Sequence, residues 1–434
     1  MKSKRILMKK NHIFNGIIGL LLTLAVPAAG ETWAIRSARL IPVSGPVVEK
    51  GHLIVREDFI ESLGPDAVIP ADASLIEGDG LWVYPGLIDA FSTLGLTEVG
   101  AVQATVDVTE TGLYNPHIRA IAAINPHSVH IPVTRVNGIT TALVAPDGGV
   151  VSGQCALINL DGWTAHEMVL EPSIAMRINF PALPSPSGSR RRGRGGETPT
   201  EKRTEEQIQG LKDLLLKAGR YADAIGAHYK DPGLRAPLHD VMLEALIPLV
   251  RGERLAIICV NTAKDIENAV AFVRETGIRA VFQGVVEGWK VADLLRENNI
   301  PVLVGSLFRS VGPRDPYDAI YANPGILSKA GVKVAFLTGS AADARNLPYQ
   351  AGTAAAFGMD RDEALKGVTL YPAQIFGVDR WIGSLEPGKL ANVVVTDGDI
   401  LEMRTQIRYL FIKGNRVSLE TKDTELFEKF RKRN

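Results

Sequence analysis

Side chains that could bind a metal or act as nucleophiles are few in this 434-residue chain. It has two cysteines and eight histidines, and no histidine follows His239. A nucleophilic thiol needs a neighbouring base, and a zinc site needs several imidazole, thiolate or carboxylate ligands. Cys259 has no histidine near it in the sequence, so a thiol buried in a strand is the better interpretation. Cys155 is interpreted in the same way, although the sequence leaves a disulfide between the two open.

His127 and His130 are the histidines whose spacing comes closest to a metal-binding pattern. Three positions apart, they could share one face of a helix. The local sequence Asn125-Pro126-His127-Ser128 is rich in turn-forming residues, however. We therefore expect a surface turn here.

The middle of the chain alternates between apolar runs and amphipathic segments. Continuous apolar runs predict strands that are buried on both faces, and steps of about twenty residues fit strand–helix units. A distorted (β/α)8 barrel over residues 85–383 is the most economical arrangement. The apolar runs lie at residues 139–144, 255–260, 280–282, 301–304 and 332–337, and helical patterns follow at Lys264–Val273 and after Trp289.

Both ends of the chain show a different, period-two pattern of short antiparallel strands. Turns are predicted at Glu57-Asp58 and at Lys413-Gly414-Asn415. Neither end buries enough apolar surface to be stable alone. We expect residues 31–84 and 384–420 to form one composite β-sandwich.

The first thirty residues resemble a secretory signal. Five basic residues and no acidic one precede an apolar run that ends in small residues. The run is too short to span a bilayer comfortably, so we expect cleavage near residue 30, export to a periplasmic or extracellular location, and no stable membrane span afterwards. The formal net charge of zero for the whole chain gives no indication of a nucleic-acid partner.

Residues 185–205 have no apolar side chain and carry a cluster of arginines. Such composition predicts a disordered insertion at the surface. A contact with an anionic surface is the alternative, but the segment lacks interleaved aromatic residues.

The sequence YPGLIDAFSTLGL at residues 84–96 resembles the first barrel strand of the amidohydrolase superfamily, most like its imidazolonepropionase-related and prolidase-like branch. The resemblance extends over nearly the whole chain after residue 30. It includes residues 94–110, Asn125-Pro126, residues 345–352 (RNLPYQAG) and residues 382–392 (IGSLEPGKLAN). It implies a metal-dependent hydrolase fold that would use zinc or another divalent cation.

The same resemblance implies that every expected metal ligand is replaced. Relatives carry His-x-His at the first strand, one histidine each at the fifth and sixth strands, and an aspartate at the eighth. The corresponding positions here are Phe91 and Thr93, Cys259 or Asn261, Gln283, and Gly339. Phenylalanine, glycine and threonine are not zinc ligands, and neutral amides are poor ones. We therefore expect no metal and no other cofactor.

Two further groups of residues are pocket candidates through the resemblance. Uncharged polar side chains would line the former metal site and suit a small neutral polar ligand: Ser92, Thr93, Asn261, Gln283, Thr338 and Ser340. Carboxylates beside the pocket could bind substrate or transfer protons, although helix caps and a solvated loop are the favoured interpretation: Asp89, Glu98, Asp107 and Glu110.

The leading hypothesis is an exported, catalytically degenerate amidohydrolase-like protein. It would keep a ligand pocket or a subunit interface, through which it would form a homo-oligomer or a hetero-oligomer with an active relative. A hydrolase of C–N bonds in cyclic amides or dipeptides, using Cys259, Asp89 and water, is one alternative. A structural or adhesive exported protein, favoured by the arginine-rich segment, is the other.

Overall fold

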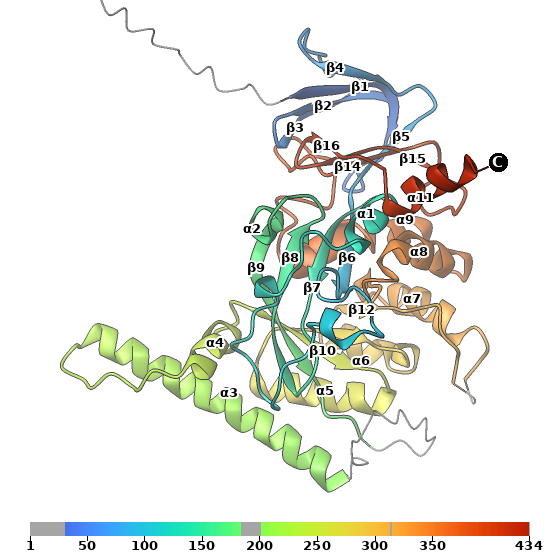
Figure 1. Ribbon diagram of the computed structural model, residues 1–434. Coiled ribbons are helices and arrows are strands. Elements are labelled where there is room, and N and C mark those ends of the chain that lie inside the picture. The colour runs from blue at the N-terminus through green and yellow to red at the C-terminus, as the bar shows by residue number, and fades with distance from the viewer. Residues whose placement is uncertain (1–30, 184–200, 313–314, 434) are drawn as a thin grey trace, which may run out of the picture.

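The computed structural model describes residues 31–183, 201–312 and 315–433, which form two eight-stranded sheets set end to end (Figure 1). The predicted signal segment, residues 1–30, and residues 185–200 of the predicted insertion lie outside the described residues. Among the described residues, no helix combines the length and apolarity that a membrane span needs.

The first sheet joins the two ends of the described chain. Its central contact is antiparallel, where Tyr84 pairs with Val394. The sequence predicts short antiparallel strands, but β1 pairs in parallel with both β4 and β5, so that part of the prediction is wrong. The order is β16-β15-β14-β5-β1-β2-β3, with β4 beside β1. The strands are β1 (Thr32–Leu40), β2 (Val48–Arg56), β3 (Phe59–Gly64), β4 (Ser74–Glu77), β5 (Trp82–Pro85), β14 (Val393–Thr396), β15 (Ile407–Ile412) and β16 (Asn415–Arg416).

Both predicted turns of this sheet are confirmed. Glu57 and Asp58 connect β2 to β3, and Lys413 and Gly414 connect β15 to β16. Lys413 and Gly414 have φ values of 49° and 73°, the positive φ that tight two-residue hairpins require. The two turns lie against each other, because a Cβ on Gly414 would collide with the carbonyl oxygen of Glu57. The two ends of the chain are thus held together at their turns as well as along their strands.

The second sheet is the barrel, in the order β13-β12-β11-β10-β9-β8-β7-β6. Its interior is a closed apolar cluster that includes Ile88, Ile257 and Val281. The distorted (β/α)8 barrel expected from the sequence is confirmed. The strands are β6 (Leu87–Ser92), β7 (Ile139–Val144), β8 (Val151–Asn159), β9 (Val169–Asn179), β10 (Leu255–Val260), β11 (Ala280–Gly284), β12 (Val302–Val304) and β13 (Val334–Phe336).

One barrel strand runs against the others. β8 is antiparallel to both β7 and β9, whereas the other neighbouring pairs in this sheet are parallel. Only residues 145–150 separate β7 from β8, and a parallel crossover needs a dozen or more residues. A short return therefore forces a hairpin, which distorts the barrel.

Helices cover the outside of the barrel from β10 onward (Figure 1). The predicted helix after Lys264 is α5, capped by Thr262 at its start and by Gly277 in the left-handed conformation at its end. The helices are α1 (His130–Arg135), α2 (Ala165–Met168), α3 (Glu201–Lys230), α4 (Val241–Val250), α5 (Ala263–Thr276), α6 (Ala292–Glu297), α7 (Ala319–Lys329), α8 (Leu347–Ala356), α9 (Arg361–Lys366), α10 (Leu370–Phe376) and α11 (Lys422–Arg431).

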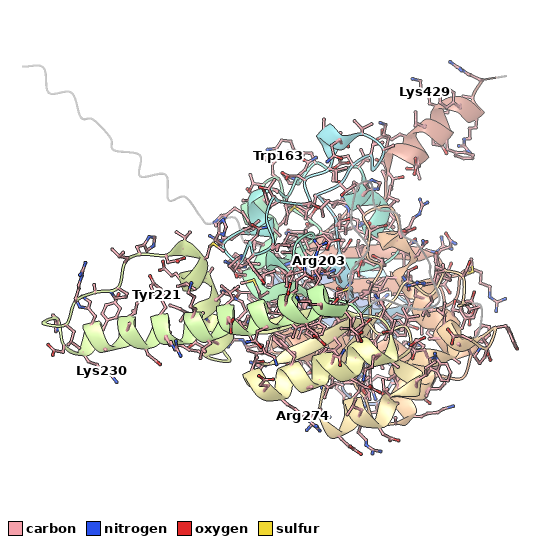
Figure 2. All side chains as sticks on the ribbon, turned by 90° about the horizontal axis from the view of Figure 1, so that it is seen from below. Trp163, Arg203, Tyr221, Lys230, Arg274 and Lys429 are labelled. Carbon is pink, nitrogen blue, oxygen red and sulfur yellow. The ribbon has the colours of Figure 1, made fainter. Side chains whose placement is uncertain are left out.

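The long helix α3 begins inside the segment predicted to be disordered. Residues 201–205 form its first turn, so the prediction is wrong for those five residues. Glu, Lys and Arg favour helices, and Thr204 is buried with its hydroxyl donating to the carbonyl of Ala182 at 3.0 Å. Figure 2 shows the far half of α3, with Tyr221 and Lys230, projecting beyond the body of the molecule.

Candidate functional site

The carboxyl ends of β9, β10 and β11 bring four polar side chains to the inner face of the barrel. Cys259 of β10 lies directly opposite Gln283 of β11 on one side and directly opposite Asn179 of β9 on the other. Arg177 precedes Asn179 by two residues. Side chains two apart on a strand share a face, and Ala175, which continues the series, belongs to the barrel interior. The four side chains therefore converge at the mouth of the barrel.

Arg177 is the centre of this cluster. Its side chain is only 5% exposed. Its Nη1 donates to Oε1 of Gln283, and its Nε donates to Oδ1 of Asn179 at 3.2 Å. The guanidinium carbon lies 4.3 Å from the centroid of the Phe91 ring, a cation–π contact. The side chains of Phe91 and Gln283, at two positions that the resemblance assigns to replaced metal ligands, thus contact the positively charged guanidinium of Arg177.

Asp147, on the loop between β7 and β8, faces this cluster from the solvent side. Its Oδ1 lies 3.7 Å from Nη2 of Arg177 and accepts a 3.0 Å hydrogen bond from Nδ2 of Asn179. The Asp147 side chain is 56% exposed. The same Asn179 amide also contacts the carbonyl oxygen of Gly149 and the hydroxyl of Ser152. Asn179 therefore ties the loop to the strand that carries Arg177.

Asp89 does not join the mouth cluster but bridges the two strands at which the barrel closes. Its Oδ1 accepts hydrogen bonds from the backbone N–H groups of Phe91 at 3.2 Å and Thr338 at 3.0 Å. Its Oδ2 accepts from the Thr338 hydroxyl. Complete burial raises the pKa of Asp89 to about 7, although all three hydrogen bonds oppose the shift. Both oxygens are used to hold β6 against the segment after β13.

The other residues of the first and eighth strands also satisfy one another. The Thr93 hydroxyl accepts from the N–H of Ala341 at 3.1 Å. The Ser92 hydroxyl accepts from the N–H of Leu94 at 3.3 Å. Ser340 donates its hydroxyl hydrogen to Asp343 at 2.8 Å. These contacts stabilise the ends of the strands.

Gly339 has a conformation that suits glycine. Its φ is 81°, in the left-handed region that L residues adopt at a cost. Its N–H donates to the carbonyl oxygen of Phe91 at 3.0 Å. The position that the resemblance matches to an aspartate is thus part of the backbone closure of the barrel.

The remaining candidates do not converge on the mouth cluster. Glu98 accepts from the side chain of Asn125 and from the N–H of Val129, which fits the favoured interpretation of a structural carboxylate. Asp107 and Glu110 are exposed. Asn261 is exposed and lies against Gly284, where a Cβ would collide with its side chain.

The described residues do not fit a divalent cation. No group of three or more His, Cys, Asp and Glu side chains among them is placed to hold a metal ion. The donor set at the mouth consists of amides and one thiol beside a buried guanidinium. Amide oxygens are weak ligands for zinc, and a guanidinium repels any cation placed near it.

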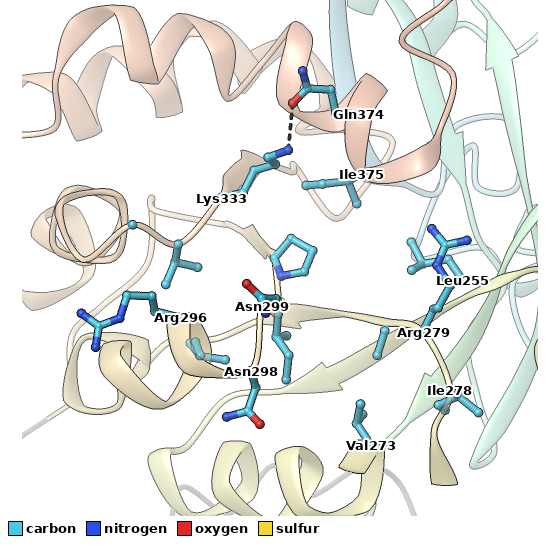
Figure 3. Close-up of a pocket in the computed structure, with 16 residues that line it drawn as sticks. Leu255, Val273, Ile278, Arg279, Arg296, Asn298, Asn299, Lys333, Gln374 and Ile375 are labelled. Carbon is cyan, nitrogen blue, oxygen red and sulfur yellow. Dashed lines mark hydrogen bonds between the residues drawn. The ribbon is translucent and has the colours of Figure 1, made fainter. Parts of the chain in front are cut away.

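Several cavities among the described residues lie away from the mouth. One of about 540 Å³ lies at the amino ends of the strands, where Leu255 begins β10 and Lys333 precedes β13 (Figure 3). There Nζ of Lys333 donates to Oε1 of Gln374 at 2.8 Å. In barrels of this type, active sites form at the opposite, carboxyl face. We assign no chemistry to this cavity.

Three of the residues that matter most were not predicted from the sequence: Arg177, Asn179 and Asp147. β8 and β9 were not among the predicted strands, so their inner face could not be considered. One signal was available, because Arg177 is a single charge between Met176 and Ile178 in an otherwise apolar run. A lone charge in such a run is expensive to bury and therefore points to a specific partner.

Comparisons with known proteins agree with this architecture. The model of the amidohydrolase family matches residues 319–419. Amidohydrolase tasK from Hapsidospora irregularis is 23% identical over 405 residues, which cover 85% of this chain, but the chain spans only 39% of that protein's length.

Among solved structures, an amidohydrolase from Thermotoga maritima MSB8 is 25% identical with a TM-score of 0.77, covering 89% of this chain and 99% of its own. A prolidase complexed with N-methylphosphonate-L-proline is similar in fold alone. It is 16% identical with a TM-score of 0.52, again covering 89% and 99% of the two chains. The distorted barrel, the composite sheet built from both ends and these matches together support the assignment of the chain to the amidohydrolase superfamily.

Proposed function

We propose that this chain is an exported amidohydrolase-fold protein that does not carry out metal-dependent hydrolysis and instead binds a ligand at the mouth of its barrel. The observation that carries the proposal is the buried guanidinium of Arg177 among Phe91, Gln283 and Asn179. Two like unit charges 4 Å apart repel by roughly 4 kcal/mol at an effective dielectric constant of 20. The repulsion between the guanidinium and a divalent cation at the same distance would be about twice that energy.

The expected ligand differs from the one that the sequence suggests. The lining was expected to be uncharged and to suit a neutral polar molecule. With Arg177 among the lining residues, a ligand with a negative or strongly electron-rich group is favoured. Export is supported only by the basic and apolar pattern of residues 1–30.

The proposal is tested by metal analysis and assay of the purified mature chain. We expect zinc, manganese and iron to be far below one equivalent after purification, and no turnover of dipeptides or cyclic amides with or without added metal. One equivalent of tightly held metal, lost together with hydrolysis on chelation, would overturn the proposal.

The alternative hydrolase built from Cys259, Asp89 and water is less well supported. Asp89 has both oxygens engaged in closing the barrel, and Thr338 supplies two of the three hydrogen bonds. A base must be able to reach its substrate proton. If Cys259→Ser abolished a measurable C–N hydrolysis while the fold persisted, this alternative would return.

A subunit interface is favoured by the projecting arm formed by α3 and α4. Tyr229, at the end of α3, is 82% exposed, and Leu238, in the loop before α4, is 84% exposed. Large apolar side chains exposed on a projecting arm are typical of contact surfaces. Lys230 and Asp231 beside Tyr229 carry opposite charges, so two copies could pair around a twofold axis. Light scattering would show a dimer that Tyr229→Ser with Leu238→Ser converts to a monomer, whereas one mass for both proteins would contradict a self-interface.

A further inference from the structure

We infer that the Nη2 side of Arg177 is a binding site for a small carboxylate, which Asp147 occupies when no ligand is bound. This inference rests on the proposed function, because it requires that no metal ion sits at the mouth. It adds the chemical class of the ligand and a competitor supplied by the chain itself.

The charge of Arg177 is poorly compensated by its surroundings. Its hydrogen-bond acceptors are the neutral amide oxygens of Gln283 and Asn179. Among the described residues, Asp147 supplies the one carboxylate within 4.0 Å of the guanidinium. A buried cation whose partners are mainly neutral is costly, and an anion that approaches it gains correspondingly.

Asp147 shows how a carboxylate is recognised at this place. One of its oxygens faces Nη2 of Arg177 and accepts from Nδ2 of Asn179. The two donors come from neighbouring inward positions of β9, so their spacing is set by the strand and not by the loop. A carboxylate from solution could accept from the same two groups.

The internal carboxylate is a weak competitor. Its 3.7 Å separation from Nη2 exceeds the 2.7–2.9 Å typical of charge-assisted hydrogen bonds. More than half of its side chain is exposed, and two glycines with positive φ, Gly148 and Gly149, follow it in the loop. A free carboxylate can approach the guanidinium more closely than the tethered one does.

Succinate and its neutral diamide, succinamide, are the probes that test this inference. Binding is measured by calorimetry and by thermal shift at constant ionic strength, on the full mature chain. We expect succinate to bind and succinamide not to bind. Because Asp147→Ala removes this weak competitor and its negative charge, it should strengthen succinate binding by about two- to tenfold.

Two further variants identify the donor. Arg177→Met keeps an apolar stem against Phe91 and should abolish binding, and Arg177→Lys should retain part of it. Arg135 and Asp161 provide the matched control. They form a comparable, partly buried ion pair that lies away from the mouth cluster, with 3.0 Å between Nη1 of Arg135 and Oδ1 of Asp161. Asp161→Ala should leave succinate binding unchanged.

Several outcomes would overturn the inference. Equal binding of succinate and succinamide would show that the site does not recognise the negative charge of the ligand. Unchanged succinate binding in a folded Arg177→Met protein, or in Asp147→Ala, would place the ligand elsewhere. If the metal-free protein does not bind succinate, the carboxylate site alone is refuted. If the protein instead holds stoichiometric metal and hydrolyses its substrates, the proposed function is refuted.

Discussion

The N–H of Thr338 donates a 3.0 Å hydrogen bond to Oδ1 of Asp89, although the two residues lie 249 positions apart in the sequence. Asp89 is in β6 and Thr338 is the second residue after β13, so this bond links the first strand of the barrel to the end of the last. Gly339 adds a second link through the carbonyl oxygen of Phe91. Residues that the resemblance places near catalysis thus close the barrel in this protein.

Asp89→Asn should flatten the dependence of stability on pH. In the folded protein the pKa of Asp89 is raised to about 7 by burial, against 3.8 for an ordinary aspartate. The protonated form therefore contributes stability that is fully present below about pH 3.8 and is lost as the pH rises through 7. Between pH 5 and pH 8.5 we expect the wild type to lose on the order of 1–4 kcal/mol through this group, and the variant to lose less. Urea unfolding at several pH values measures the difference.

Asp89→Leu is the companion variant. It removes the acceptor of the Thr338 N–H and leaves a buried donor unsatisfied, so we expect lower stability at every pH. If Asp89→Asn kept the full pH dependence of the wild type, another group would have to be responsible.

Gly414→Ala should destabilise the composite sheet far more than Gly388→Ala. Both glycines have positive φ, 73° and 85°, so both substitutions incur backbone strain of about 1–2 kcal/mol. A Cβ at Gly388 meets nothing within 4 Å, whereas one at Gly414 collides with the carbonyl oxygen of Glu57. Thermal unfolding of the two variants separates the collision from the strain, and equal melting temperatures would mean that the two turns are not in contact.

The sequence predicts the regular parts of the barrel well, because their signals are local. The apolar runs at residues 139–144 and 255–260 coincide with β7 and β10. The helix after Lys264 is bounded by a capping threonine and a glycine that are visible in the sequence. An apolar run does not reveal its direction, however, and β8 is buried along its whole length. Its antiparallel orientation depends on the length of the preceding loop and on its neighbours.

The mouth cluster could be predicted only in part, because its contacts are long-range. Gln283 was identified through the resemblance, but its partner Arg177 lies 106 positions away. Asp147 is in a loop and carries no periodic signal. The resemblance implies that metal ligands are replaced, while only the three-dimensional arrangement shows that a guanidinium lies beside Phe91 and Gln283.

Cys155 should be inert towards thiol reagents in the folded protein. It lies in the barrel interior, and burial raises its pKa to about 12, so the reactive thiolate is scarce at neutral pH. In Cys259→Ser, where Cys155 is the remaining cysteine, we expect no labelling by a disulfide reagent in buffer and one equivalent in denaturant. Rapid labelling of the folded variant would show that the barrel interior opens.

Gly339→Asp would place a carboxylate after the last barrel strand, where the resemblance implies one in relatives, but it should not create a metal site. With φ at 81°, the substitution incurs strain of about 1–2 kcal/mol, while the nearest atom to a new Cβ, in Leu337, is at an acceptable 3.6 Å. Arg177 stays at the mouth against Phe91, which supplies no ligand, so the new carboxylate would lack other metal ligands. We expect a melting temperature a few degrees lower and no retained zinc after dialysis.

Gly339→Asn serves as the uncharged control. Because asparagine tolerates positive φ better than most residues, this variant should be destabilised less than Gly339→Val. One equivalent of zinc held by Gly339→Asp would show that the mouth still accommodates a cation despite Arg177.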